Sequence, residues 1–297
     1  MYLEFQVGST LQIANELVRC VEEISLNALP ALQTMHLDGW VLRFANGYTK
    51  RANSINPIYD GADNVEEKIR FCEEIYRRKH LPVVFKMTKT AQPENLDSIL
   101  ADKGYEINSP TSVQIAELGN VDSSLLSTCH FERSEKSRLI RDEISRRQNP
   151  PPRNDRLCSY DSSPNAQATE TLTEEWFAQF CRMNNIAEKN KSTLWQILAN
   201  IDLPKCFVTV GNDGKSVACG MSVMQGQYIG LFDIVTDASF RNKGFGKQTV
   251  RRLLAWGKEN GARRAYLQVM ENNAPALQLY SQVGFTPVYQ YWYRIKN

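Results

Sequence analysis

The segment Arg241-Asn242-Lys243-Gly244-Phe245-Gly246 decides the fold of this chain of 297 residues. It lies between a predicted strand over residues 228–236 and a predicted helix over residues 245–260. The first amides of a helix have no partner inside the helix, and the helix dipole adds positive potential at the same end. Glycines let a bulky anion approach the backbone closely. The order strand, glycine turn and helix therefore predicts a phosphate-binding loop.

By itself, this loop also fits an ordinary tight turn from a strand into a helix. It lacks the third glycine of the dinucleotide-binding fingerprint. It also does not match the Gly-x-x-x-x-Gly-Lys-Ser/Thr motif of P-loop nucleoside triphosphatases. A second pattern is needed to choose between these interpretations.

The second pattern follows the predicted helix along the chain. Leu267-Gln268-Val269 is a predicted strand, Asn273 opens the next helix, and Val283-Gly284-Phe285 closes it. Tyr280 lies on that helix, and a phenol stays protonated at neutral pH, so it can donate a proton to a leaving thiolate. Each part alone also has an ordinary structural interpretation. Tyr280 would then be a core aromatic residue, and Asn273 a helix N-cap.

Together the two patterns resemble the GNAT superfamily of acyl-CoA-dependent N-acyltransferases. The resemblance rests on Phe232-Asp233-Ile234-Val235-Thr236-Asp237, the loop Arg241 to Gly246, Asn273, Tyr280 and Gly284-Phe285, and it covers residues 205–293. It implies an α/β fold of the α+β type, a mixed central sheet flanked by helices. It also implies acetyl-CoA as co-substrate.

The resemblance further implies roles for individual residues. The strand end would offer its backbone to the pantetheine arm, the loop would hold the pyrophosphate, and Asn273 would bind the pantetheine or phosphate side. Tyr280 would be the general acid. The predicted cofactor-binding residues are Ile234, Val235, Thr236, Arg241, Asn242, Lys243, Gly244, Phe245, Gly246, Lys247 and Asn273.

The general base is harder to assign. Several members of the superfamily carry a glutamate on the strand before the second pattern, where this chain has Gln268. A glutamine cannot accept the proton of an amine, so Asp233 is the predicted substitute. Asp233 could equally be an edge carboxylate, and a chain of water molecules could serve instead.

The first half of the chain resembles a degenerate copy of the same domain. When Gly104 is aligned with Gly284, Leu100 falls at the position of Tyr280, and Pro93 at that of Asn273. The loop corresponding to the phosphate loop, residues 59–64, carries acidic residues and lacks its glycine pattern. A generic α/β domain with a chance match is the other interpretation. One CoA site per chain is expected.

Two further predictions concern this half. Asn46-Gly47 predicts a hairpin between strands over residues 39–44 and 48–55. The first half could also help to build the acceptor site, and its polar and aromatic candidates are then Trp40, Arg43, Asn46, Tyr48 and Asn53. An equally good interpretation is that these five are ordinary strand and turn residues.

The predicted domains are residues 1–120, a linker over residues 121–164, and a catalytic domain over residues 165–297. The linker is rich in charge and contains Asn149-Pro150-Pro151-Pro152, which cannot continue a helix. Cys129 to Ser137 resembles a translated interspersed repeat, which predicts that part of the linker is an insertion.

Composition narrows the possible functions. The chain is 42% hydrophobic and 23% charged, as in soluble globular proteins. Its net charge of +2 is too small to indicate nucleic-acid binding, and its three scattered histidines argue against a metal site. Seven unpaired cysteines favour a reducing cytoplasm, and neither a membrane segment nor a signal peptide is expected.

The predicted function is transfer of an acetyl group from acetyl-CoA to a primary amine of a small molecule, in a ternary complex. A monomer or homodimer is expected. Acetylation of a protein or peptide amine is one alternative, and a non-catalytic CoA-binding sensor or scaffold is another.

Overall fold

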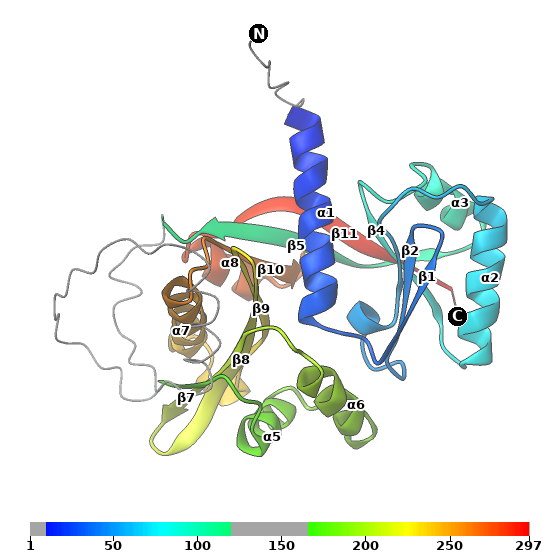
Figure 1. Ribbon diagram of the computed structural model, residues 1–297. Helices are drawn as coiled ribbons and strands as arrows, with labels where there is room; N and C mark the ends of the chain where they lie inside the picture. Colours follow the sequence, from blue (N-terminus) through cyan, green and yellow to red (C-terminus); the bar gives the residue numbers. More distant parts are fainter. Residues whose placement is uncertain (1–9, 120–165, 297) are drawn as a thin grey trace, which may run out of the picture.

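The computed structural model describes residues 10–119 and 166–296. The strands form one mixed sheet of eleven, in the order β1-β2-β3-β4-β11-β5-β10-β9-β8-β7-β6, flanked by helices (Figure 1). The strands are β1 (Gln33–Leu37), β2 (Trp40–Phe44), β3 (Ile55–Pro57), β4 (Val83–Thr88), β5 (Glu106–Glu117), β6 (Ala166–Thr169), β7 (Lys205–Asn212), β8 (Lys215–Gln225), β9 (Tyr228–Thr236), β10 (Arg264–Met270) and β11 (Thr286–Lys296). The helices are α1 (Thr10–Ala28), α2 (Val65–Arg78), α3 (Leu96–Asp102), α5 (Glu174–Met183), α6 (Glu188–Ala199), α7 (Phe245–Glu259) and α8 (Ala274–Ser281), with 3-10 turns η1 (Lys50–Ala52) and η3 (Ala238–Phe240).

The two halves of the chain repeat one order of elements. In each, an antiparallel meander of strands is followed by a helix, a parallel strand, a short helix and a last strand. β3 and β4 are parallel in the first half, as β9 and β10 are in the second. Gly104 and Gly284, which end the two short helices, have φ of 80° and 97°. The predicted tandem GNAT-like arrangement is confirmed at the level of the fold.

The last strands of the two halves change places at the centre of the sheet. β11 lies between β4 and β5, and β5 lies between β11 and β10, all as antiparallel neighbours. Each half therefore receives the last strand of the other beside its own parallel strand. The predicted boundary within residues 121–164 stays a prediction, because that linker, with its insertion-like segment, lies outside the described residues.

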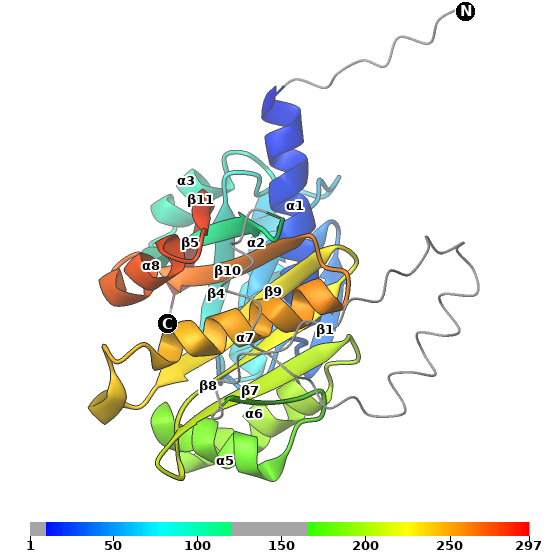
Figure 2. The same ribbon diagram turned by 90° about the vertical axis from the view of Figure 1, so that its left-hand side faces the viewer.

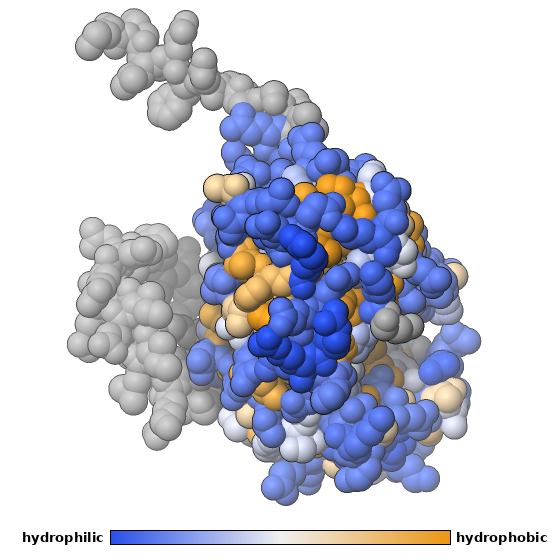
Figure 3. Space-filling model, turned by 90° about the vertical axis from the view of Figure 1, so that its right-hand side faces the viewer, coloured by the Kyte–Doolittle hydropathy of each residue, from blue (hydrophilic) through white to orange (hydrophobic). Residues whose placement is uncertain are grey.

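Separate cores cover the two faces of the sheet. On one face, α1 packs across the middle of the sheet and α5 packs on β7, β8 and β9, and their core includes Val21, Trp176, Phe232 and Tyr266 (Figure 1). On the other face, α7 and α8 cover β8, β9 and β10 (Figure 2). A further core lies under α2 and α3, and the surface on that side is mainly hydrophilic (Figure 3). No helix within the two described ranges is both long and apolar enough to cross a membrane.

The hairpin predicted at Asn46-Gly47 is wrong in its return strand. Both residues adopt positive φ, but the Asn53 side chain accepts the amides of Ala45 and Gly47 at 2.7 and 2.9 Å. These contacts hold the chain in a compact loop, so β3 begins only at Ile55. The tight hairpin turn forms instead at Asp38–Gly39, between β1 and β2.

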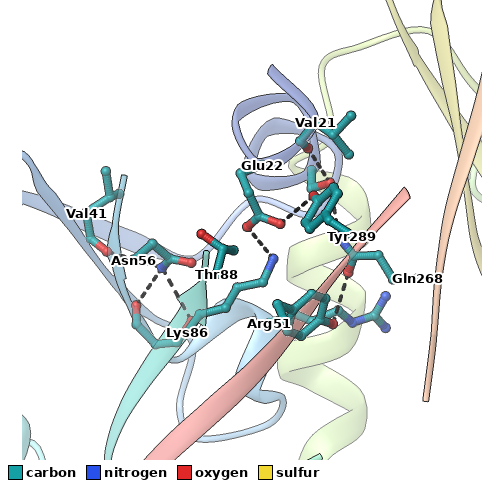
Figure 4. A network of polar contacts seen from close by, with 12 residues as sticks. Val21, Glu22, Val41, Arg51, Asn56, Lys86, Thr88, Gln268 and Tyr289 are labelled. Atoms are coloured by element: carbon teal, nitrogen blue, oxygen red, sulfur yellow. Dashed lines mark hydrogen bonds and ion pairs between the residues drawn. The ribbon is translucent and has the colours of Figure 1, made fainter. Parts of the chain in front are cut away.

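A buried polar network joins α1 to the exchanged strands. The carboxylate of Glu22 accepts a hydrogen bond from the Tyr289 hydroxyl at 2.7 Å and pairs with the Lys86 ammonium at 2.5 Å (Figure 4). Both charged side chains are 5% exposed. The Lys86 ammonium also lies 4.1 Å from the centre of the Tyr291 ring. Helix α1 is therefore tied to β4 and β11 by one carboxylate.

The substitution Glu22→Gln is expected to lower the free energy of unfolding by about 3–5 kcal/mol, because it leaves the Lys86 charge buried without its counterion. Chemical denaturation checks this as a lower midpoint with an unchanged m value. Glu16→Gln, on the exposed face of the same helix, is the control and should change stability by less than about 0.5 kcal/mol. Equal stability of the two variants would contradict a stabilising role for the pair.

Candidate active site

The strands β9 and β10 separate beyond Leu231. Their parallel pairing runs from Arg264 opposite Tyr228 to Leu267 opposite Leu231, whereas β9 continues to Thr236. On its other side, the pairing of β9 with β8 shifts register between Phe232 and Val235. The bulged residue Asp233 has φ of 53°. Among the described residues, the backbone of Ile234, Val235 and Thr236 therefore has no strand partner on the β10 side, and the Thr236 carbonyl accepts a long hydrogen bond from Arg241 Nε at 3.5 Å.

Gly220 on β8 accommodates this bulge. A Cβ atom at Gly220 would lie 3.0 Å from the Ile234 side chain and 2.9 Å from that of Thr249 on α7. Residues with a side chain would push the bulged strand away from β8, so glycine lets β9 and α7 approach closely.

The predicted phosphate loop lies between η3 and α7. Asn242 and Gly244 have φ of 60° and 86°, and Gly244 is the N-cap of α7. The amides of residues 242–247 donate no hydrogen bond to any described group. Successive amides in such a turn form a concave anion site at the positive end of the helix. The first four residues of the loop are exposed, so these donors can be reached from solvent.

Gly246 brings the loop, the end of β9 and α8 together. A Cβ atom there would lie 3.2 Å from Thr236 Oγ1 and 3.5 Å from a methyl carbon of Leu279. The lysine of the loop, Lys243, has its ammonium 5.1 Å from the centre of the Phe240 ring. The structure thus places the loop and the strand end predicted for cofactor binding side by side.

Tyr280 lies on α8, on the same face of the sheet as α7. It is 9% exposed and packs edge-on against Phe285, with ring centres 6.0 Å apart. Its hydroxyl has no hydrogen-bond partner among the residues the structure describes. Burial raises the pKa of Tyr280 to about 12, so the phenol is protonated at neutral pH. A protonated phenol, able to donate a hydrogen bond or a proton to a ligand, is therefore available on the α7 and α8 face of the sheet.

Asn273 has the ordinary structural role that its position predicts. Its side-chain oxygen accepts the Ala276 amide at 3.3 Å and caps α8. The residue is exposed, so its side-chain amide nitrogen can still reach a ligand.

Asp233 faces the opposite side of the sheet, towards α1 and α5. Its Oδ1 pairs with Nη2 of Arg51 at 3.0 Å, and its side chain is 11% exposed. Burial and the neighbouring Asp233 carboxylate raise the pKa of Tyr48 to about 12. The predicted acid and base therefore come from opposite faces of the sheet, beside the point where β9 leaves β10.

Gln268 also faces α1, and it has a structural role. Its side-chain oxygen accepts the Tyr291 hydroxyl at 3.2 Å, and its nitrogen donates to Ser25 at 3.1 Å (Figure 4). Sequence reasoning missed Tyr289, Tyr291 and Tyr293, although their alternation on one strand is a signal for a shared buried face. Arg51 carried no such signal.

The candidates named on the first half separate into two groups. Trp40, Arg43 and Asn53 are buried and serve the fold. Tyr48 lies near Asp233, and Asn46 contacts Thr193 of α6 at 3.1 Å.

The corresponding turn of the first half is closed by the chain itself. The carboxylate of Asp38 accepts the amides of Ala62 and Asp63 at 3.0 and 2.9 Å, just before α2. The Lys68 ammonium lies 3.0 Å from the same carboxylate. An internal anion thus takes the donors that a phosphate would need.

These contacts make Asp38 sensitive to acid. Hydrogen bonds from Asp63 and Ala62, then Lys68, lower the pKa of Asp38 to about 2, against about 3.9 in an unfolded chain. The ionised form therefore stabilises the fold above about pH 4, and this contribution is lost as the pH falls towards 2. Asp38→Asn is expected to lower stability at pH 7 and to flatten its dependence between pH 4 and 2. Thermal melts between pH 4 and 2 measure this effect. The control is Asp102→Asn at an exposed position, where the dependence of stability on pH should persist.

Comparison with known proteins assigns the fold and the family. The Acetyltransferase (GNAT) family model matches residues 167–285, and a model described as "Probable histone acetyltransferase Rv0428c C-terminal" matches residues 16–130. The Bacillus subtilis (strain 168) protein named "Uncharacterized N-acetyltransferase YobR" is 30% identical over 286 residues, which cover 94% of this chain and 99% of that protein. Streptothricin acetyltransferase of Streptomyces lavendulae is 32% identical over 85 residues, which cover 27% of this chain and 44% of that protein.

Solved structures share the whole architecture at low identity. A GCN5-related N-acetyltransferase from Kribbella flavida has a TM-score of 0.60 and 13% identity, and the match covers 94% of this chain and 95% of that one. A tandem GNAT protein from the clavulanic acid biosynthesis pathway has a TM-score of 0.55 and 10% identity, with 93% and 87% covered. Because the relative from Bacillus subtilis matches almost the full chain, the protein belongs to the GNAT family of acetyltransferases.

Proposed function

We propose that the protein transfers the acetyl group of acetyl-CoA to a primary amine of a small molecule, in a ternary complex. The observation that carries this proposal is the run of unpaired amides over residues 242–247, beside the point where β9 leaves β10. The amides fit a pyrophosphate, and the unpaired edge of β9 fits an extended amide-containing arm.

In this proposal the chain binds CoA through its backbone. The amides of residues 242–247 hold the pyrophosphate, with Arg241, Lys243 and Lys247 adding positive charge. Ile234, Val235 and Thr236 hydrogen-bond the pantetheine arm as an added strand would. Asn273 adds a side-chain contact at the start of α8.

Bound acetyl-CoA would supply the thioester whose acetyl carbon receives the amine. As the new N–C bond forms and the C–S bond breaks, Tyr280 gives its proton to the departing sulfur. Asp233, on the acceptor side, takes the proton that the amine loses, directly or through water. An amide of the separated strand β9 polarises the thioester carbonyl. After release of the products, Asp233 gives its proton to solvent and Tyr280 takes one up, which restores both groups.

Release of free thiol from acetyl-CoA tests this proposal, measured against a panel of small amines and a lysine-containing peptide. Turnover with small amines supports it, and turnover with the peptide alone would favour a protein substrate. Tight CoA binding by calorimetry, without thiol release from any amine, would favour a sensor and overturn the catalytic proposal.

A further inference from the structure

Arg51 is the contribution of the first half to the acceptor side of the site. It belongs to η1, on the loop that follows β2, and its guanidinium reaches Asp233 on β9 at 3.0 Å. These two residues lie 182 positions apart in the sequence. The ion pair therefore joins the two halves beside the proposed base.

The loop that carries Arg51 is held on several sides. The buried Arg43 donates to the Arg51 carbonyl at 2.5 Å, and Asn53 donates to the Thr49 carbonyl at 2.9 Å. Ala52 is fully buried and belongs to a small core with Ile197 of α6. A side chain on such a loop is positioned before any ligand arrives, which lowers the cost of binding.

The guanidinium of Arg51 has N–H donors that its contact with Asp233 does not use. Its side chain is 32% exposed, and Asp233 is its sole hydrogen-bond or ion-pair partner in the described part of the chain. A guanidinium carries five N–H donors in a planar fork. Several of them can therefore take a second anion beside Asp233.

The charge on η1 is also positive in excess. The neighbouring Lys50 ammonium is held by the neutral side chains of Asn108 and Ser109, at 2.5 and 2.8 Å, and has no carboxylate partner among residues 10–119 and 166–296. Lys50 and Arg51 thus put two cations on η1, and of the two, only Arg51 pairs with a carboxylate in the described ranges. The environment favours a ligand that brings negative charge of its own.

We propose that Arg51 binds an acidic group of the acceptor while it holds Asp233. The acceptor is then an amine that carries a carboxylate or phosphate close to its amino group. This inference rests on the proposed function, and it makes Arg51 a determinant of specificity supplied by the half that has lost its own cofactor loop.

Matched acceptors that differ in one acidic group provide the test. Amino acids are compared with their carboxamides, and phosphoethanolamine with ethanolamine, by thiol release from acetyl-CoA. The wild type should prefer the acidic member of a pair. Arg51→Gln should reduce that preference roughly tenfold to hundredfold, as loss of a charge-assisted contact does, and Arg51→Lys should retain part of it. Arg51→Gln also removes the ion-pair partner of Asp233, which should slow the reaction with every acceptor by the same factor. The readout is therefore the ratio of the rates with the acidic and the neutral member of each pair.

Arg294→Gln is the matched control, because Arg294 pairs with Asp97 at 2.7 Å within the first half and its exchanged strand. It should keep the preference, and all variants should bind CoA as the wild type does. A wild type that prefers the uncharged members, or an Arg51→Gln variant that keeps the acidic preference, would overturn the inference.

Failure of the proposed function would be seen separately, as no thiol release from any amine. In that case, the guanidinium NMR signal of Arg51, assigned by its loss in Arg51→Gln, is followed in CoA-saturated protein during titration with acetate and with inorganic phosphate. A saturable shift with either anion supports the inference, and an unmoved signal overturns it.

Discussion

Replacing Gly246 with aspartate is expected to abolish CoA binding, with a loss of affinity of at least about 100-fold, since like charges brought together cost several kcal/mol. The new carboxylate would stand at the first turn of α7, among the unpaired amides of residues 242–247. It would repel the pyrophosphate and accept those amides itself, as Asp38 accepts the corresponding amides in the first half. Calorimetric titration with CoA measures the effect.

Gly246→Ala is the control for size without charge. Its Cβ atom would lie 3.2 Å from Thr236 Oγ1 and 3.5 Å from Leu279, a close fit that small shifts can relieve. A loss of affinity of less than about tenfold is expected, which corresponds to less than about 1.4 kcal/mol. If aspartate and alanine weaken binding equally, crowding rather than charge is responsible, and the pyrophosphate does not lie at this turn.

Removing the hydroxyl of Tyr280 should slow the reaction and leave CoA binding nearly unchanged. Tyr280→Phe keeps the ring against Phe285 but removes the proton donor, and loss of a general acid costs about 10²–10⁴-fold in kcat. Single-turnover thiol release and CoA titration measure the two effects separately. If the variant fails to bind CoA, or turns over at the wild-type rate, Tyr280 is not the acid.

The pH dependence gives a second readout for Tyr280. Burial raises its pKa to about 12, and the group must be protonated to act as an acid. Its contribution is therefore present at all pH values well below 12 and is lost only above that value. A fall in kcat between pH 8 and 10 that disappears in Tyr280→Phe would contradict this environment.

Local patterns predicted the elements that carry the proposed cofactor site. The strand predicted over residues 228–236 is β9, and the helix predicted over residues 245–260 is α7 to within one residue. At the start of α5, the Thr173 side chain accepts the Trp176 amide at 3.1 Å and so caps the helix. These features depend on capping, glycine conformation and hydrophobic period, which a few neighbouring residues determine.

Contacts between distant residues could not be predicted in the same way. The placement of β5 between β11 and β10 depends on which strand edges meet in the folded chain, and the local pattern of a strand does not specify its neighbours. The pairing of Arg51 with Asp233 likewise follows from the compact loop after β2, where Asn46-Gly47 indicated a simple hairpin. The edge strand β1 was missed because Gln33–Leu37 is short and contains only two apolar residues, Met35 and Leu37.

The exchange of β5 and β11 has a consequence for how the protein is made and how its gene can change. Glu117 at the end of β5 pairs with Arg264, which leaves the ribosome 147 residues later. Until then, β5 and β4 have unpaired edges that can associate with other chains or recruit chaperones. A nascent first half cannot complete its part of the sheet, and neither half can be transferred to another gene without losing a central strand. The two halves therefore form one folding unit, although the turn of the first half that corresponds to the phosphate loop is occupied by the Asp38 carboxylate.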